Sequence, residues 1–424
     1  MNMTRRTALQ RTATLSLGAA ILPKLRAADL DSAHRKLRVA VVALGRGMGH
    51  VKALLSLPNV EIAYLAEVDP KRLEVGMKAV TEKQGSSCQG VKDFRTFLDD
   101  KSLDAVFIAT PNFWHTPAAI LALKAGKHVY VEKPGSSNPH EAELIVAAQK
   151  KYGRLVQMGN QRRTWMKEGM AALHGGAIGT VRYARSFYYN ARGAIGQGKL
   201  KASPDIDWDL WQGPVTSDGD IKPFVHYDWH WLWHWGNGEL GNNGIHFLDI
   251  LRWGLQVEYP ERVTYNGNRY WYQDKQETPD TGVALYDCGK AGGMEFVQSS
   301  CHPRPAEKPL GECVFYGENG TLALTVAGWQ VFDSKGTKTS EGKSSLKGDA
   351  AHIGNFLEAI RGNEKLNSPI EEGQKSTMLC HLGNIAYRTN TVVRVDPKTG
   401  KMIDNPAGEK LWKREYRPGW EPTI

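Results

Sequence analysis

The stretch LRVAVVALGRGMGH, residues 37–50, decides the expected fold. Seven of its first eight residues are apolar and three of them are valine, which predicts a strand buried on both faces, as in a parallel sheet. Glycines at 45, 47 and 49 follow, and then a helical run from Val51 to Leu57. A strand, a glycine turn and a helix N-terminus form a site for a phosphate, because backbone N–H groups face it and no Cβ intervenes.

The glycines match the dinucleotide fingerprint G-x-G-x-x-G incompletely, in two registers. One begins at Ala43, with Gly45 second and Met48 third; the other begins at Gly45, with Gly47 second and His50 third. An ordinary strand–helix turn is the alternative interpretation. We expect the cofactor to contact Gly45, Arg46, Gly47 and Met48.

An acidic residue ends the next apolar run. Val60–Ala66 predicts a second strand, and Glu67 follows it, 22 positions after Gly45. A carboxylate there accepts a hydrogen bond from an adenine-ribose 2′-hydroxyl and repels a 2′-phosphate. The sequence therefore predicts NAD rather than NADP; the alternative is a solvated acid at a strand end. Asp69 and Pro70 then predict a helix start.

Strands and helices continue to alternate as far as residue 158. We expect strands at 104–111, 128–131 and 155–158 and helices at 117–124 and 139–150. This alternation predicts a doubly wound parallel sheet, with ligands at the carboxyl ends of its strands. The strand-end residues expected to converge there are Thr110, Asn112, Glu132, Lys133 and Asn160.

The pattern changes from residue 159. Strand-like runs at 181–189, 262–265, 282–286, 294–299 and 312–316 lack long helices between them, which predicts an open, largely antiparallel sheet. Residues 335–347 predict a surface loop, and 355–361 and 373–387 predict helices. We therefore expect two domains, a Rossmann domain at 36–158 and a C-terminal α/β substrate and oligomerisation domain at 159–424.

Three motifs occur together in this framework: Thr110-Pro111-Asn112-x-x-His115, Glu132-Lys133-Pro134 and Gly244-Ile245-His246-x-x-Asp249. With them the chain resembles the glucose–fructose oxidoreductase, inositol dehydrogenase and rhizopine catabolism family over nearly its whole length after residue 36. The resemblance implies that the second domain covers the nucleotide and carries the substrate pocket. It also implies a homodimer or homotetramer through the outer face of the second sheet, and cofactor contacts at Thr110, Asn112, His115, Glu132 and Lys133.

The first 28 residues form a separate segment. Arg5-Arg6 and the short apolar run from Ala13 to Leu22 resemble a twin-arginine export signal, which predicts a periplasmic protein; a basic tail is the alternative. The apolar run is too short to span a membrane. This segment carries five of the 54 basic residues and no acid, so the net charge of +9 falls to +4 without it. No dense basic stripe points to nucleic acid, and the five scattered cysteines predict at least one free thiol.

Lys133 and His246 are the expected catalytic residues. An ammonium fixed at a strand end can stabilise developing alkoxide charge, and the family's catalytic lysine matches Lys133. The imidazole of His246 can take a proton from a sugar hydroxyl. Asn242 and Asp249 are expected on or near the same helical face, if the helix starts at Gly241, and to contact the substrate. Many relatives have Asp where this chain has Asn242, which leaves the identity of the base open.

A run rich in tryptophan and histidine, residues 224–235, precedes them. It predicts a sugar platform to which His230 offers hydrogen bonds; core packing is the alternative, and a metal bound by histidines 226, 230 and 234 at helical spacing is a third. We expect no metal. Gln161 and Arg163 are further substrate candidates. Arg162 and Arg163 are suited either to an acidic sugar substituent or to an interface.

The leading hypothesis is an exported oxidoreductase that binds NAD tightly and transfers hydride between nicotinamide and a secondary carbinol of a sugar or polyol. The alternative is an NAD-dependent redox glycosidase, in which transient oxidation drives elimination from a glycoside. A silent sugar-binding protein is a third class, which an intact Lys133 and His246 oppose.

Overall fold

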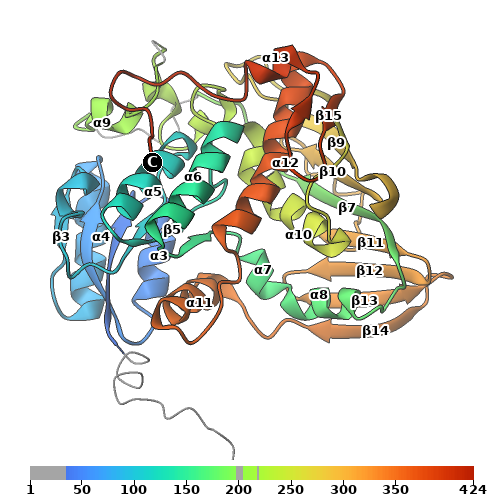
Figure 1. The fold of residues 1–424 in the computed structure, drawn as a ribbon, viewed down its shortest axis with the longest axis horizontal. Coiled ribbons are helices and arrows are strands. Elements are labelled where there is room, and N and C mark those ends of the chain that lie inside the picture. The colour runs from blue at the N-terminus through green and yellow to red at the C-terminus, as the bar shows by residue number, and fades with distance from the viewer. Residues whose placement is uncertain (1–34, 197–203, 217–218) are drawn as a thin grey trace, which may run out of the picture. The chain divides into compact units, whose positions relative to one another are not determined.

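The computed structural model describes residues 35–196, 204–216 and 219–424. The predicted export signal, residues 1–28, lies outside this part. Within it, no helix combines the length and apolar character that crossing a membrane requires. Two sheets with covering helices make up the described chain (Figure 1).

The first sheet contains six strands in the order β3-β2-β1-β4-β5-β6, all parallel. The strands are β1 (Leu37–Val42), β2 (Val60–Ala66), β3 (Gln89–Val91), β4 (Ala105–Ile108), β5 (His128–Val131) and β6 (Val156–Met158). The helices between them are α3 (Gly47–Leu54), α4 (Pro70–Gln84), α5 (Asn112–Lys124) and α6 (Pro139–Tyr152). This is the strand order of the Rossmann fold, so the predicted first domain fold is confirmed.

Alternating burial explains why β1 is the central strand. Val39 and Val41 pack into one hydrophobic cluster and Ala40 and Val42 into the other, so the strand serves a core on each face. At the start of α4, the Asp69 side chain accepts a hydrogen bond from the Lys71 backbone N–H at 3.0 Å, and Pro70 occupies the first turn. The predicted helix start is therefore confirmed.

The second sheet contains ten of the described strands, in the order β14-β13-β12-β11-β7-β10-β9-β8-β15-β16. Strands β7 and β10 pair in parallel, whereas every other described neighbour for which a register is known pairs antiparallel. The strands are β7 (Val181–Tyr189), β8 (Arg262–Asn268), β9 (Thr281–Asp287), β10 (Gly293–Ser299), β11 (Cys313–Gly317), β12 (Gly320–Thr325), β13 (Gly328–Asp333), β14 (Lys338–Lys343), β15 (Val393–Val395) and β16 (Met402–Ile403). The predicted open, largely antiparallel sheet is confirmed.

The loop predicted at 335–347 is wrong in its centre, because β14 occupies Lys338–Lys343. This strand is exposed at nearly every position and pairs only with β13. An edge strand without a buried face has no alternation of apolar and polar residues, so its sequence looks like that of a loop.

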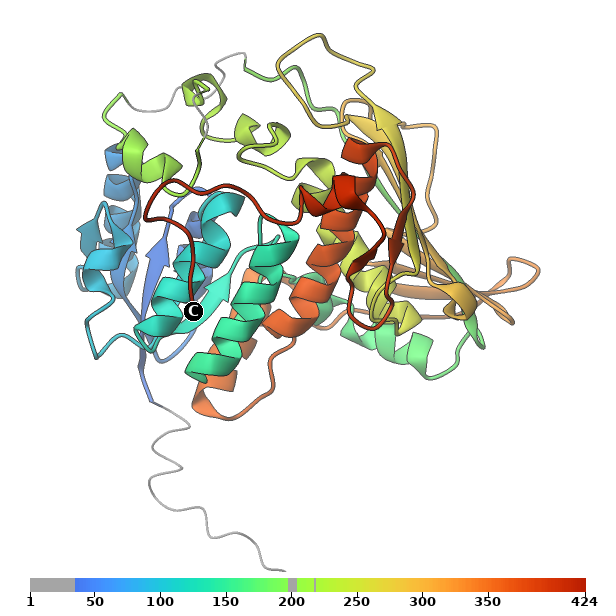
Figure 2. The same ribbon diagram turned by 45° about the horizontal axis from the view of Figure 1, so that its top comes forward.

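The helices of the second half are α7 (Arg162–Trp165), α8 (Lys167–His174), α9 (Trp208–Gln212), α10 (Ile245–Leu255), α11 (Gly348–Arg361), α12 (Ile370–Thr389) and α13 (Pro406–Glu409). Of these, α8, α10 and α12 pack on the second sheet, and α12 also contacts β6 of the first. Figure 2 shows α10 and α12 between the two sheets, and α12 also contacts α6.

Helix α11 belongs to the Rossmann core although it comes late in the chain. Its Ile353, Phe356 and Leu357 are buried in the same cluster as Val39 and Val41, and the helix contacts α3 (Figure 1). The boundary after residue 158 coincides with the end of β6 and stays a proposal, since α11 returns across it.

Candidate active site

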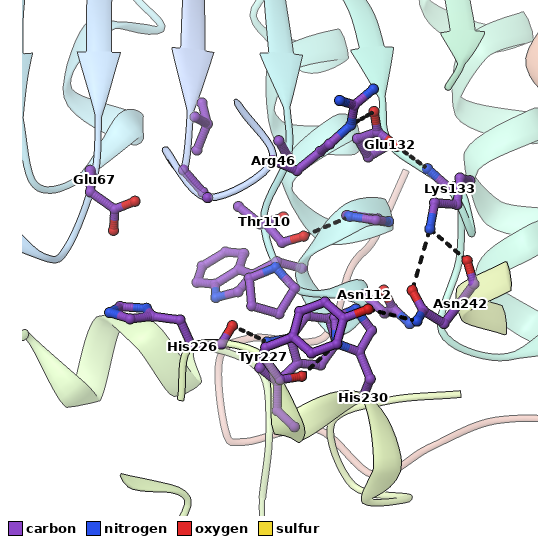
Figure 3. Close-up of a pocket in the computed structure, with 18 of the residues that line it drawn as sticks. Arg46, Glu67, Thr110, Asn112, Glu132, Lys133, His226, Tyr227, His230 and Asn242 are labelled. Carbon is purple, nitrogen blue, oxygen red and sulfur yellow. Dashed lines mark hydrogen bonds and ion pairs between the residues drawn. The ribbon is translucent and has the colours of Figure 1, made fainter. Parts of the chain in front are cut away.

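A cavity of about 770 Å³ lies at the carboxyl ends of the first sheet's strands. Figure 3 shows the arrowheads of those strands pointing toward it, with Glu67 at one end and Lys133 beside Asn242 at the other. The segment that carries His226, Tyr227 and His230 forms the opposite wall. The cavity is therefore long enough to bring the nucleotide motifs and the expected catalytic residues into one space.

The turn after β1 has the conformation that the fingerprint requires. Ala43 has a φ of 67°, in the left-handed region that glycine normally occupies, so the register beginning at Ala43 is the one the backbone adopts. Gly45 and Arg46 line the cavity, and α3 begins at Gly47 with no acidic residue in its first turn. A Cβ on Gly47 would lie 3.1 Å from Val41, which explains that glycine by packing. The helix N-terminus and its exposed turn fit a pyrophosphate.

Glu67 is fixed by its own backbone surroundings. Its two carboxylate oxygens accept hydrogen bonds from the N–H groups of Leu44 at 2.6 Å and Asp69 at 3.0 Å. Burial raises the pKa of the carboxyl group, although these bonds oppose the shift. A carboxylate has about four acceptor sites, so capacity remains for a ribose hydroxyl. His226 reaches across the same end, with Nε2 3.0 Å from Oδ2 of Asp69.

Residues after β4 offer a polar group to the middle of the cavity. Oγ1 of Thr110 is buried and has no hydrogen-bond partner among the described residues, which is what a missing ligand would leave. Asn112 donates to Oδ1 of Asn237 at 3.0 Å. Both ring nitrogens of His115 are engaged, by the carbonyls of Pro134 and Thr110, and burial lowers the pKa of this histidine. His115 therefore positions the turn.

Glu132 is surrounded by hydrogen-bond donors. Its carboxylate contacts Nε of Arg46 at 3.0 Å, Nε2 of His50 at 2.9 Å and Nε2 of Gln161 at 3.3 Å. Burial alone would raise the pKa of Glu132, but Arg46, His50 and Lys133 hold it well below its usual range. Glu132 therefore remains charged and ties the glycine turn to the end of β5. Gln161 lines the cavity, as Glu132 does.

Lys133 faces the far end of the cavity. Its Nζ donates to the backbone oxygen of Asn242 at 2.6 Å and lies 3.4 Å from Oδ1 of the same residue. Burial lowers the pKa of Lys133, and the charge of Glu132 partly opposes that shift. An ammonium held by neutral oxygens is available to a substrate oxygen.

His246 lines the same end, in the second position of α10. Its Nδ1 is buried and has no hydrogen-bond partner in the described part of the chain. Burial, followed by the charges of Lys133 and Arg162, lowers the pKa of His246 well below its usual range, so the ring is neutral at neutral pH. Asn242 lies in a π-helical turn, Leu240–Gly244, rather than in the α-helix expected from Gly241 onward, yet it also lines the cavity.

Tyr227 is the main cavity residue that sequence reasoning missed. Its hydroxyl accepts a hydrogen bond from Nδ2 of Asn242 at 3.1 Å. His230 stacks on Trp229 with ring centroids 3.7 Å apart, and burial lowers its pKa to about 3. The only signal for Tyr227 was its place in the aromatic run beside His230. Residues 228–231 form a 3-10 turn, so histidines 226, 230 and 234 do not share one side of a helix, and no described cluster of His, Cys, Asp or Glu is arranged to hold a metal ion.

Five residues expected at the site lie outside the cavity lining: Gly47, Met48, Asn160, Arg163 and Asp249. Met48 packs against the hydrophobic cluster around β1. Arg163 and Asp249 form a buried ion pair, with Nε 2.9 Å from Oδ2, and Ser376 donates a hydrogen bond to Asp249 at 2.6 Å. The structure thus gives this pair a packing role instead of the substrate contacts predicted from spacing.

Arg72, Lys92 and Asp349 are charged residues that line the cavity and were not predicted. Of Arg162 and Arg163, both expected at an acidic sugar substituent or an interface, Arg162 lines the cavity. Asp349, in the first turn of α11, forms an ion pair with Arg46 at 2.7 Å. Its separation of 303 residues from Arg46 left no local sequence signal. All five cysteines are free and buried, so the predicted free thiol is confirmed.

A comparison with known protein families finds a match to the Rossmann half of the chain. Residues 37–160 match the model of an oxidoreductase family with an NAD-binding Rossmann fold. This match places residues 37–160 with the NAD-binding domains of that oxidoreductase family. The family predicted from the three motifs is therefore confirmed, and the export signal stays a prediction.

Two curated relatives and one solved structure illustrate the similarity. A glycosyl hydrolase family 109 protein of Saccharopolyspora erythraea is 29% identical over 211 residues, 45% of this chain and 46% of its own. Inositol 2-dehydrogenase of Salmonella typhimurium is 27% identical over 162 residues, 37% and 46% of the two chains. The chain thus spans about half the length of these relatives. The WlbA dehydrogenase of Bordetella pertussis, in complex with NADH and UDP-GlcNAcA, has a TM-score of 0.64 at 19% identity and covers 85% of this chain and 99% of its own, which shows the shared fold.

Proposed function

We propose that this protein is an NAD-dependent oxidoreductase acting on a sugar or sugar-like polyol. The observation that carries the proposal is one continuous cavity with the glycine turn and Glu67 toward one end and Lys133 and His246 toward the other. Dehydrogenation of a carbinol needs a nucleotide next to a proton acceptor, and this cavity provides room for both.

Residues of the cavity fit NAD at three points. The turn at Gly45 and the start of α3 suit the pyrophosphate, Glu67 suits the ribose hydroxyls, and the unpartnered Oγ1 of Thr110 suits a polar group farther along. When bound there, the nicotinamide supplies hydride acceptance and donation. We propose NAD rather than NADP because Glu67 is fixed by two backbone N–H groups and cannot turn away from a 2′-phosphate.

Lys133 and His246 handle the substrate oxygen and its proton. Neutral His246 accepts the hydroxyl proton at an unprotonated ring nitrogen as the carbinol becomes a carbonyl, and returns it in the reverse direction. The Lys133 ammonium donates a hydrogen bond to the same oxygen and stabilises its developing charge. Asn242 holds Lys133 without adding a charge.

A redox glycosidase is the second candidate, and Tyr227 favours it. Elimination from a glycoside needs a proton donor for the leaving group besides the base. The Tyr227 hydroxyl lies in the cavity, bonded to Asn242, on the wall opposite Lys133. The relative named as a glycosyl hydrolase family 109 protein supports this candidate, and the one named inositol 2-dehydrogenase supports the first.

One experiment separates these functions. Protein purified without added nucleotide is denatured and the released dinucleotide identified; fresh protein is then mixed with sugars, polyols and aryl glycosides while reduced nicotinamide is followed by absorbance. Released NAD and lasting, substrate-dependent reduction support the dehydrogenase. Aglycone release without lasting reduction supports the glycosidase. If no dinucleotide is released and none binds, the proposal is refuted.

The cellular location and the oligomeric state of the protein are also proposals. The twin-arginine-like segment supports export to the periplasm, where scarce free NAD favours a tightly retained cofactor. Twin-arginine export carries folded proteins, which suits cofactor loading before export. The family resemblance supports a homodimer or homotetramer.

A further inference from the structure

Arg162 lines the cavity with part of its hydrogen-bonding capacity unused. Its Nη1 donates to Glu312, and its guanidinium lies 4.6 Å from the ring centroid of Phe247. Its Nε and Nη2 have no hydrogen-bond partner among the described residues. The side chain is only 17% exposed, so the guanidinium is held in place while the one edge formed by Nε and Nη2 remains available.

Lys133 places a positive charge at the substrate end of the cavity, and Arg162 adds hydrogen-bond donors there although Glu312 balances its charge. Arg162, Lys133 and His246 all line the cavity, and both cations lower the pKa of His246 after burial does. The nearby carboxylates of Glu132 and Asp349 are already paired with Arg46. A negatively charged substituent entering this end would be attracted and would find donors.

A carboxylate matches these donors better than a phosphate does. One planar guanidinium edge binds one carboxylate through two parallel hydrogen bonds. The same edge can bind a phosphate, but the second charge of a phosphate dianion would lack a cation there, because Lys133 is committed to the reacting oxygen and Arg46 to its two carboxylates. Arg163 cannot act as the second cation, because it forms a buried ion pair with Asp249.

We propose that Arg162 binds a carboxylate on the substrate, so that the sugar taken by this site is an acidic one, such as a uronic acid. This inference rests on the proposed function, because it names the substrate class of the same cavity.

The test compares acidic and neutral sugars matched in every other respect. Glucuronate with glucose, galacturonate with galactose, and glucose 6-phosphate are offered to the protein with NAD bound. Initial rates of nicotinamide reduction are measured, and binding is followed by tryptophan fluorescence, because Trp165, Trp211 and Trp229 line the cavity. We expect kcat/KM and affinity to be about tenfold to a hundredfold higher for each uronate than for its neutral partner.

Variants assign the preference to one side chain. Arg162→Gln should lower kcat/KM for uronates about tenfold to a hundredfold more than for neutral sugars, since both lose the Glu312 pair and the charge near His246 but only uronates lose the pair with the substrate carboxylate. Arg162→Lys should have a kcat/KM for uronates between those of the native protein and Arg162→Gln, because lysine keeps the positive charge without the planar pair of N–H donors. Arg182→Gln is the matched control: Arg182 also pairs with a glutamate, Glu318, but lies outside the cavity lining. Thermal melting and retained dinucleotide show that each variant is folded.

Each outcome decides the matter. Equal use of neutral sugars and uronates, or unchanged uronate binding by Arg162→Gln, overturns the inference and leaves the oxidoreductase standing. Preference for glucose 6-phosphate over glucuronate overturns the assignment of a carboxylate as the group that Arg162 binds. If no sugar is bound or oxidised and no dinucleotide is held, the proposed function fails as well.

Discussion

Exchanging Glu67 for glutamine tests the cofactor end of the cavity directly. The amide has nearly the size of the carboxylate and can still accept the N–H of Leu44, now 2.6 Å from Oε2, but its NH2 group cannot accept the N–H of Asp69, so thermal melting of the variant must accompany the binding data. What disappears is the negative charge facing the ribose. Glu74, exposed on α4, provides a matched Glu→Gln control outside the cavity.

The expected changes in affinity are opposite for the two nucleotides: NADH should bind more weakly and NADPH more tightly. A charge-assisted hydrogen bond contributes about 1.5–3 kcal/mol and a neutral one about 1 kcal/mol, so NADH should bind about threefold to thirtyfold more weakly. A carboxylate about 4 Å from a phosphate charge repels it by about 4 kcal/mol at an effective dielectric of about 20. Removing that repulsion should strengthen NADPH binding by at least about tenfold, even after screening by salt.

Fluorescence titration of nucleotide-free protein with NADH and NADPH measures both affinities. The ratio of the two dissociation constants should shift by about a hundredfold toward NADPH in Glu67→Gln and stay unchanged in Glu74→Gln. Burial raises the pKa of Glu67, so the native preference for NADH should also weaken as the pH falls and the carboxylate gains its proton. A ratio that moves less than about threefold in Glu67→Gln would show that Glu67 does not select the cofactor.

Four further outcomes test other parts of the structure. Lys133→Met should lower kcat by at least about a hundredfold and leave the released dinucleotide unchanged, as measured by turnover and by denaturation of the same sample. Ala43→Gly should raise stability by about 1 kcal/mol in chemical denaturation, because φ is 67° there; a lower midpoint would contradict the strain. Asp249→Asn should lower the free energy of unfolding by up to about 3–5 kcal/mol, since it removes the nearer charge partner of the buried Arg163 and leaves only Glu372, 3.8 Å away. Burial lowers the pKa of His352 to about 4, so the neutral ring's contribution to stability is complete above pH ~6.5 and lost as the pH falls toward 4, and His352→Gln should flatten that slope in urea titrations at several pH values.

The Rossmann half was predictable because its sequence signals are local. The apolar run at 37–42 is buried on both faces, and Asp69 with Pro70 marks the start of α4, so each element could be recognised within a few residues. The incomplete fingerprint has a physical explanation: Ala43 adopts the left-handed conformation that glycine adopts more readily. Most strand-end residues converge on the cavity because parallel strands share one carboxyl edge.

The errors arise where a residue's role depends on distant partners. Arg163 and Asp249 had the right chemistry for a substrate, but α7 and α10 bring them together as an internal ion pair. Asp349 reaches Arg46 from the other end of the chain, and Tyr227 enters the cavity through a turn without regular periodicity. Strand β14 escaped prediction because both of its faces are exposed.

The position of α11 has a consequence for biosynthesis. The strands of the first sheet are complete once Met158 has been made, but one wall of its core needs residues up to Arg361. At about 5–20 residues per second, a ribosome takes roughly 10–40 s to supply those residues. During that interval the apolar side chains around Val39 and Val41 lack their cover, so the nascent chain is a substrate for chaperones, and a fragment ending near residue 158 should be recovered as aggregate rather than as a nucleotide-binding domain.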